Sequence, residues 1–250
     1  MKFENTKVFN FEGALRGMRN PMESWSKSDS CLCSDMVCVR CSQNKDNGNE
    51  CSLGGRTDFA IGKNDTELAQ TLIRAGSEHR KFMRQIFVSV DITAPLYWWK
   101  EFDTYKVGTV ANSTSTMHKL ASTPITKDCF EMDDFENFMS EQTLMGNRID
   151  NEGMWFVFLN YLEWLRQKYN ETKDIRYWKE LIRILPESWL QKRTVTMDYE
   201  NLLAICSKGQ RRFHKLTEWS KSFIDWARTL PYAQELIFID ELEEKENGSM

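Results

Sequence analysis

The sequence contains no apolar run long enough to span a membrane, which takes about 20 mostly apolar residues. Its first residues, M-K-F-E-N-T-K, lack the apolar segment of a secretory signal. Basic residues are not in excess either, because the formal net charge is −4. A broad nucleic-acid-binding surface is therefore not expected, although a local basic pocket is compatible with this charge. We expect a cytosolic protein that binds neither membranes nor DNA.

Histidine is scarce, with three residues in a chain of 250. Large apolar side chains are not: hydrophobic residues make up 41% of the sequence and aromatic residues 12%, including nine Trp and fifteen Phe. This length and composition allow one large core or two small ones. No internal repeat is visible in the sequence.

Apolar residues recur with two different periods, one typical of strands and the other of helices. Alternation predicts strands at residues 7–11 and 85–93, the second with Ile86, Val88, Val90 and Ile92 on one face. A loop is expected through residue 25, followed later by a helix that starts near Asn64. From residue 133 onward the spacing of three and four predicts almost only helix, in segments 154–165, 177–185, 196–205, 213–229 and 232–242. We predict an α+β fold: a small antiparallel or mixed sheet with a predominantly helical second half.

Five of the seven cysteines lie within residues 31–51, in the pattern C-x-C-x4-C-x2-C-x9-C. Four thiolates can bind zinc tetrahedrally, and a cytosolic location argues against disulfides. The alternative is a flexible insertion, because S-Q-N-K-D-N-G-N-E is polar and turn-prone. The predicted zinc ligands are Cys31, Cys33, Cys38 and Cys41.

Residues 95–118 begin with aromatic side chains at helical spacing and continue, after Gly108, with a run of Thr, Asn and Ser. Such a run can turn backbone N–H groups and side-chain donors toward an anion. The alternative interpretation is a solvated connector.

This segment resembles a degenerate form of R-H-R-x-x-S-x-N-E-x-S-x-R-Y, the signature of flavin-dependent thymidylate synthases, the ThyX family. Pairing the family's Asn with Asn112 and its second Ser with Ser115 places Met117 at the Arg position and His118 at the Tyr position. Upstream, K-E-F-D-T-Y-K stands where the family often has R-Q-x-F-R-H-R, so that Lys106 replaces the last Arg. One extra residue is needed before Asn112.

Two further stretches resemble the same family in the same order. The family's H-x-x-P-F-E-H, strand and Ala-Pro correspond to H-R-K-F-M-R-Q at residues 79–85, the predicted strand and Ala94-Pro95. After the signature, Leu185-Pro186, Thr196 and Asp198 precede Q-R-R-F-H-K-L-T-E-W at residues 210–219, which corresponds to R-x-x-x-H-A-Q-W-E. The resemblance covers residues 65–240. The three histidines, one in each stretch, are expected to share one site.

The resemblance implies a homotetramer with sites between subunits. It also implies FAD reduced by NADPH, dUMP stacked on the flavin, and methylenetetrahydrofolate as the carbon donor. The implied cofactor-binding residues are His79, Lys106, Asn112, Ser113, Ser115 and His118. The implied substrate-binding residues are Lys106, Ser115, Asp198, Gln210, Arg211 and His214, and the implied catalytic residues are Arg211 and Arg212.

The departures from the family pattern are substantial. One Lys replaces the doubled arginines, and an ammonium cannot bind a phosphate bidentately as a guanidinium does. Gln85 stands at the second His, and Glu200 at the Arg of N-x-R-S-L, where a carboxylate that faced the site would repel a phosphate. A viral, phage or mobile-element origin, with the protein in the host cytoplasm, would suit such drift.

Three hypotheses follow. The first is a flavin-dependent enzyme that methylates dUMP or a related pyrimidine nucleotide. The second is a catalytically degenerate protein of the same fold that binds or sequesters a nucleotide or nucleotide signal. The third is an interaction protein stabilised by zinc at residues 31–51. The predicted segments are 1–30 (strand and loop), 31–55 (Cys-rich insertion), 56–240 (ThyX-like α+β domain) and 241–250 (acidic tail).

Overall fold

The structure, a computed structural model, describes residues 1–32, 59–105, 107–137, 139–144, 147–209 and 214–242. Its contacts divide the chain into two units that alternate along the sequence. Unit 1 comprises residues 1–2, 92–103 and 112–193, and unit 2 comprises residues 3–91, 104–111 and 194–250. The predicted segment boundaries stay a prediction.

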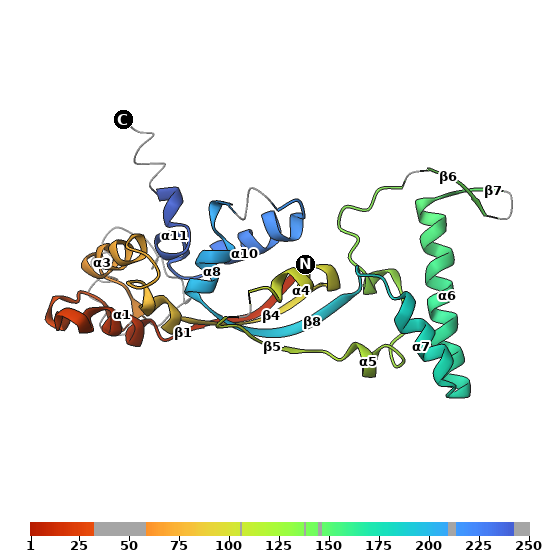
Figure 1. Cartoon of the computed structure of the whole chain (residues 1–250), viewed down its shortest axis with the longest axis horizontal. Coiled ribbons are helices and arrows are strands. Elements are labelled where there is room, and N and C mark those ends of the chain that lie inside the picture. Colours follow the sequence, from red (N-terminus) through yellow and green to blue (C-terminus); the bar gives the residue numbers. More distant parts are fainter. Residues whose placement is uncertain (33–58, 106, 138, 145–146, 210–213, 243–250) are drawn as a thin grey trace, which may run out of the picture. The chain divides into compact units, whose positions relative to one another are not determined.

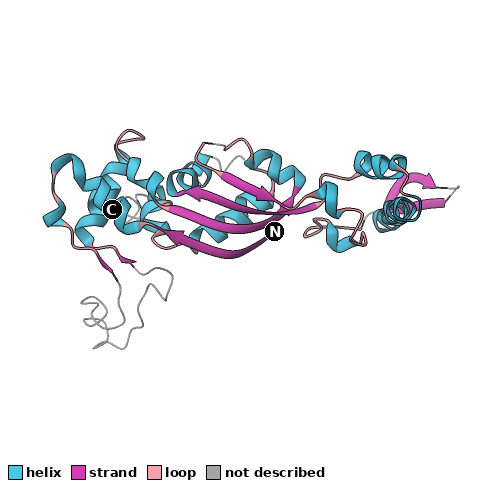
Figure 2. Ribbon diagram, turned by 90° about the horizontal axis from the view of Figure 1, so that it is seen from below, coloured by secondary structure: helices cyan, strands magenta, loops and turns pink. Residues whose placement is uncertain are grey.

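The main sheet has four strands in the order β1-β4-β8-β5 (Figure 2). They are β1 (Lys2–Phe9), β4 (Phe87–Pro95), β8 (Leu190–Asp198) and β5 (Val110–Ser113), and each contributes residues to both units. The apolar face predicted for β4 and the residue before it is confirmed, because Ile86, Val88, Val90 and Ile92 are at most 1% exposed. The predicted α+β class, a small sheet with a predominantly helical second half, is confirmed as well.

Unit 2 is built around aromatic side chains. Its helical segments are α1 (Phe11–Arg19), η1 (Asn20–Met22), η2 (Trp25–Lys27), α3 (Lys63–Arg74), η3 (Lys81–Gln85), α8 (Tyr199–Ile205), the π-helix η5 (Glu218–Phe223), α10 (Ile224–Arg228) and α11 (Ala233–Leu236). Strands β2 (Cys31–Leu32) and β3 (Phe59–Ala60) pair antiparallel. Phe11 packs edge-on against Tyr199 and Tyr232, with ring centroids 5.5 Å and 5.4 Å apart. Because edge-to-face pairs add to the energy of burial, this cluster fixes α1 against α8.

Unit 1 has its own core between two long helices. Its helical segments are α4 (Leu96–Phe102), α5 (Thr116–Lys119), η4 (Lys127–Cys129), α6 (Asn151–Thr172) and α7 (Ile175–Ile184), with a hairpin of β6 (Met139–Leu144) and β7 (Asn147–Asp150). Helices α6 and α7 lie side by side (Figure 1). The buried core residues are Leu120, Ile125, Phe130, Leu162, Leu165 and Leu181.

Several elements differ from the prediction. The first strand ends at Phe9, and helix α1 occupies the expected loop. Its buried residues Phe11, Ala14, Leu15 and Met18 have helical spacing, but Gly13 and Gly17 obscure that pattern. Strands β6, β7 and β8 interrupt the segment predicted to be nearly all helix.

Strand β8 also replaces the predicted start of a helix near residue 196. Only two apolar residues of β8, Val195 and Met197, alternate on a fully buried face. Two positions are too few to distinguish a strand from a helix by period. Helix α8 therefore begins after Asp198, which caps it.

Within the residues that the structure describes, none of the helices combines the length and the apolar character that crossing a membrane requires.

Candidate functional site

Helix α8 is joined to the first of the three histidine-bearing stretches by an ion-pair cluster. Arg80 Nε donates to Glu200 Oε1 at 3.0 Å, and Arg84 donates from Nη2 to the same oxygen at 3.3 Å and from Nε to Oε2. Burial raises the pKa of Glu200, but hydrogen bonds from Arg84 and Arg80 outweigh it, so the pKa lies below its ordinary value. Two guanidinium groups bind this carboxylate, so the cluster has a net positive charge, and the expected repulsion of a phosphate by Glu200 stays a prediction.

The signature loop lies against the first turn of α8. Asn201 Nδ2 donates to the backbone oxygen of Val107 at 2.5 Å. Gly108 has a φ of 82°, and a Cβ on it would lie 2.8 Å from Asp198 Oδ2. Only glycine fits both the backbone conformation and the space. Residues 107 and 108, which follow Lys106 directly, are thus held next to α8.

The third stretch meets the same loop through tilted ring contacts. The Trp219 ring lies 6.0 Å from Tyr105 and 5.2 Å from His214, and Trp219 is 4% exposed. Trp219 belongs to the π-helix η5, a rare conformation that is frequent at functional sites. Tyr105, which precedes Lys106, and His214, which follows the predicted Arg211 and Arg212 site, therefore belong to one neighbourhood of unit 2.

Asp198, a predicted substrate-binding residue, caps α8. Its Oδ1 accepts the Asn201 N–H at 2.8 Å, and Asn201 Oδ1 accepts the Asp198 N–H at 3.1 Å. The residue is 6% exposed, and burial raises the pKa of its carboxyl group. The structure gives this carboxylate a capping role, and its contact with a substrate stays a prediction.

The second half of the signature belongs to unit 1. The expected loop is partly a strand, since Asn112 and Ser113 lie in β5 with exposed side chains. Ser115 is the N-cap of α5, and its Oγ accepts the His118 N–H at 3.2 Å. The side chain of His118 is exposed. The backbone N–H of Thr114 donates to Lys192 O at 2.8 Å and fixes this segment against β8.

Other predicted residues are placed only in part. His79 is exposed on the turn before η3, where its N–H donates to Gly76 O at 3.0 Å. Lys106, Gln210, Arg211 and Arg212 lie outside the described residues, as do Cys33, Cys38 and Cys41. Among the described residues, no three His, Cys, Asp or Glu side chains are close enough together to hold a metal ion. Zinc at Cys31 and its neighbours stays a prediction.

Sequence reasoning missed Arg80, Arg84 and Asn201 as residues that join the stretches. A signal was present: Arg84 stands where the family's H-x-x-P-F-E-H has Glu, and Glu200 where N-x-R-S-L has Arg. Two departures of opposite charge indicate a compensating pair, which the structure contains.

No protein-family model and no curated protein sequence matches the chain. Solved structures do. Two structures of ThyX from Helicobacter pylori with FAD and dUMP are 15% and 16% identical and have a TM-score of 0.58. The alignments cover 95% and 96% of this chain and 98% of each ThyX chain. The UMP/dUMP methylase PolB from Streptomyces cacaoi, bound to 5-Br dUMP, is 11% identical, with a TM-score of 0.50 and 95% of both chains covered. The chain has the fold of flavin-dependent thymidylate synthases, and the resemblance read from its sequence is confirmed at the level of the fold.

Proposed function

We propose that this chain is a divergent ThyX-type protein that binds FAD and a uridine nucleotide and methylates dUMP or a related pyrimidine nucleotide. The observation that carries the proposal is the arrangement around α8. Glu200 binds the first stretch, Asn201 binds the signature loop, and Trp219 contacts Tyr105 and His214. The contacts of α8 and of Trp219 thus involve residues from all three motif-like stretches, which supports one shared site.

The described donors fit an anionic nucleotide. The Arg80–Glu200–Arg84 cluster has two guanidinium groups and one carboxylate, and a guanidinium suits phosphate oxygens. Arg84 is 49% exposed and can still reach a ligand. In unit 1, Asn112 and Ser113 expose an amide and a hydroxyl, groups that complete phosphate hydrogen bonds.

Each predicted residue has a chemical role in this proposal. Lys106 binds a phosphate, Asn112 and Ser113 hydrogen-bond the cofactor, and His79 and His118 line it. Gln210 and His214 hold the pyrimidine, and Arg211 or Arg212 polarises its carbonyl, which stabilises negative charge that develops on the ring. The flavin, reduced by NADPH, would supply reducing equivalents, and methylenetetrahydrofolate the carbon. A homotetramer in the cytoplasm is part of the same proposal.

A nucleotide-binding protein without catalysis is the second candidate. It is favoured by Glu200, whose carboxylate accepts hydrogen bonds from both nearby arginines and so competes with a phosphate for them. The loss of the family's second His at Gln85 points the same way. Such a protein would bind a uridine nucleotide and leave it unchanged.

Colour and thermal stability separate the two candidates. The flavoenzyme is expected to be yellow and to bleach with NADPH, and its melting temperature is expected to rise with dUMP. The nucleotide-binding protein is expected to be colourless and to show only the thermal shift. A protein that is colourless and insensitive to dUMP and UMP would refute both.

Lys106→Ala tests the phosphate contact directly. It is expected to lower nucleotide affinity by about 1.5–3 kcal/mol, the energy of a charge-assisted hydrogen bond. Lys63→Ala is the matched control. It removes a lysine on α3 whose side chain is 80% exposed, and it should leave nucleotide affinity unchanged. Equal affinities of wild type and Lys106→Ala would contradict this role.

The Cys-rich segment supports a separate structural proposal. We propose that Cys31, Cys33, Cys38 and Cys41 bind one zinc ion. Metal analysis of the purified chain should give one zinc per chain, and Cys38→Ser with Cys41→Ser should abolish it. Absence of zinc from protein purified without chelators would refute it.

A further inference from the structure

A cavity of about 260 Å³ lies in unit 2. It is open to solvent on one side and is lined by residues of α1, η2, β2 and β3, none of which belongs to the three stretches on which the proposed function rests. The lining includes Glu12, Leu15, Arg16, Arg19, Trp25 and Phe59.

The buried side of the cavity carries a guanidinium with unused donors. Arg19 is 5% exposed, and its Nε donates to Asp65 at 2.6 Å. Its Nη1 makes only long contacts with Ser24, at 3.4 Å and 3.5 Å, at the limit of a hydrogen bond. None of the described residues accepts a hydrogen bond from Nη2. Because an arginine has five N–H donors, Nη2 of this group is available to an oxygen-bearing ligand.

Ser28 and Ser30 do not compete for that ligand. Their hydroxyls donate to Asp65 Oδ2 at 2.6 Å and 2.5 Å, so the carboxylate that pairs with Arg19 is itself fixed. Asp65 therefore holds the guanidinium through its Nε, and its Nη2 is left available to a ligand. A group held in position in this way loses little entropy when it binds.

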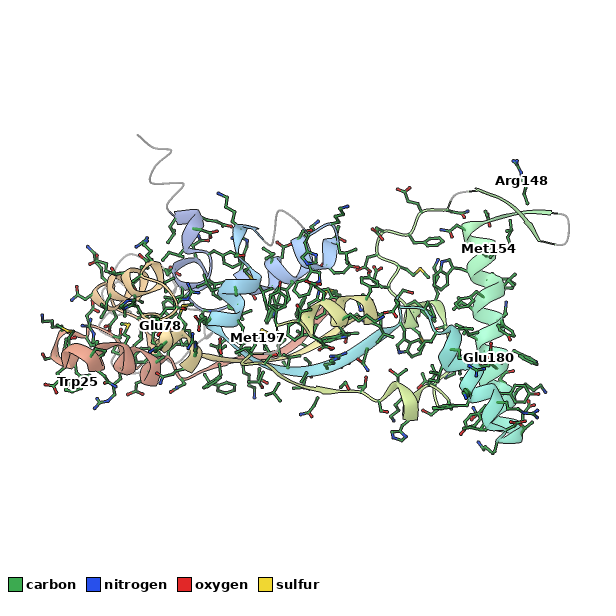
Figure 3. All side chains as sticks on the ribbon, in the orientation of Figure 1. Trp25, Glu78, Arg148, Met154, Glu180 and Met197 are labelled. Atoms are coloured by element: carbon green, nitrogen blue, oxygen red, sulfur yellow. The ribbon has the colours of Figure 1, made fainter. Side chains whose placement is uncertain are left out.

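The wall of the cavity offers a flat apolar surface. Trp25 Nε1 donates to Asn20 Oδ1 at 2.9 Å, which fixes the indole ring beside α1 (Figure 3). Arg16 stacks over this ring with Cζ 5.7 Å from its centroid. Arg16 forms no ion pair with any residue that the structure describes. Leu15 and Phe59 add apolar surface. The cavity therefore combines an aromatic wall, Trp25, with a second cation, Arg16.

We propose that this cavity binds a small planar aromatic carboxylate. The carboxylate accepts hydrogen bonds from Arg19 Nη2, the ring packs against Trp25, and Arg16 contributes a second positive charge. Glu12, the one carboxylate in the lining, disfavours ligands with more negative charge. The volume is at the small end for ligand sites and suits a single ring system rather than a dinucleotide.

Matched pairs of small probes test the charge requirement. Benzoate and nicotinate are titrated against benzamide and nicotinamide, which have the same shape without the charge, by ligand-observed NMR on the full chain. The acids are expected to bind saturably, and the amides about tenfold or more weakly, since a charge-assisted bond is lost. No saturable binding of either acid, or equal binding of acid and amide, would overturn the proposal.

Variants locate the site. Arg16→Ala is expected to weaken benzoate binding about tenfold, Arg16→Lys less, and Trp25→Ala to remove detectable binding. Arg74→Ala, which removes an exposed arginine in the last turn of α3, should change nothing and serves as the control. Melting temperatures of the four variants show that each is folded. Benzoate affinity unaffected by both Arg16→Ala and Trp25→Ala would place the ligand elsewhere and overturn the proposal.

Discussion

Arg84 and Glu200 form an ion pair across 116 residues of sequence, and Arg80 binds the same carboxylate. The pair joins η3 to α8, so it fixes the stretch that carries His79 next to the helix that holds the signature loop. In the motifs that this chain resembles, the two charges stand the other way round.

Exchanging the charges back tests this relationship. Arg84→Glu and Glu200→Arg alone each place like charges together and are expected to lower the melting temperature by about 2–4 °C. The double variant restores an opposite pair and should recover most of that loss. Thermal unfolding of the four proteins forms a double-mutant cycle. Strictly additive losses would mean that the two side chains do not interact.

Gly108 is expected to tolerate no side chain, because its φ is 82° and a Cβ would meet Asp198. Gly108→Ala should cost more stability than Gly76→Ala, which has a φ of 103° but open space around it. Gly209→Ala, with neither constraint, should be close to neutral. Chemical denaturation of the three variants gives the order, and a neutral Gly108→Ala would contradict the described loop.

Asp65 is expected to be the most sensitive polar residue of unit 2. Burial raises its pKa, but hydrogen bonds from Ser28, Ser30 and Arg19 outweigh it, so the pKa lies below its ordinary value. Asp65→Ala leaves a buried guanidinium without its partner and should cost about 3–5 kcal/mol of unfolding free energy. Asp29→Ala, which removes the side chain that accepts the Asn64 and Asp65 N–H groups, should cost only about 0.5–2 kcal/mol. Equal losses would contradict the buried pair.

Glu163 is expected to make unit 1 sensitive to acid. The hydrogen bonds from Arg166 lower its pKa from 4.5 to about 2, helped by the Ile125 N–H and Gln167. Because the folded pKa is depressed, the stabilisation is complete above the unfolded pKa and is lost as the pH falls from about 4.5 toward 2. Glu163→Gln should therefore flatten the fall of unfolding free energy over this range, measured by urea denaturation. Arg166→Met should do the same, and an unchanged slope in both would refute the assignment.

The sequence predicted the elements with a clear apolar period and missed those whose apolar period is weak. The β4 face and helices α6 and α7 followed from apolar spacing, because burial on one side dictates that period. Helix α1 was missed because its glycines and arginines outweighed four well-spaced apolar residues. Strand β8 was missed because its partners in the sheet, which make it a strand, are distant in sequence.

The candidate site was predictable at the level of segments. The sequence identified the three motif-like stretches that contact one another around α8 and Trp219. It did not predict which side chains make these contacts. The contact of Asp198 with a substrate stays a prediction, and its capping of α8 did not follow from the motif. Trp219 ends the motif-like stretch 210–219, but its contacts with Tyr105 and His214 could not be predicted, because an aromatic residue at helical spacing looks like any core residue.

The central claim is that the chain retains a flavin and uridine-nucleotide site. Its most direct test is mass spectrometry of the small molecules released when the freshly purified chain, incubated with FAD and dUMP and then desalted, is heat-denatured. FAD and dUMP are expected to be released together, in amounts close to one per chain. Release of neither would contradict the claim.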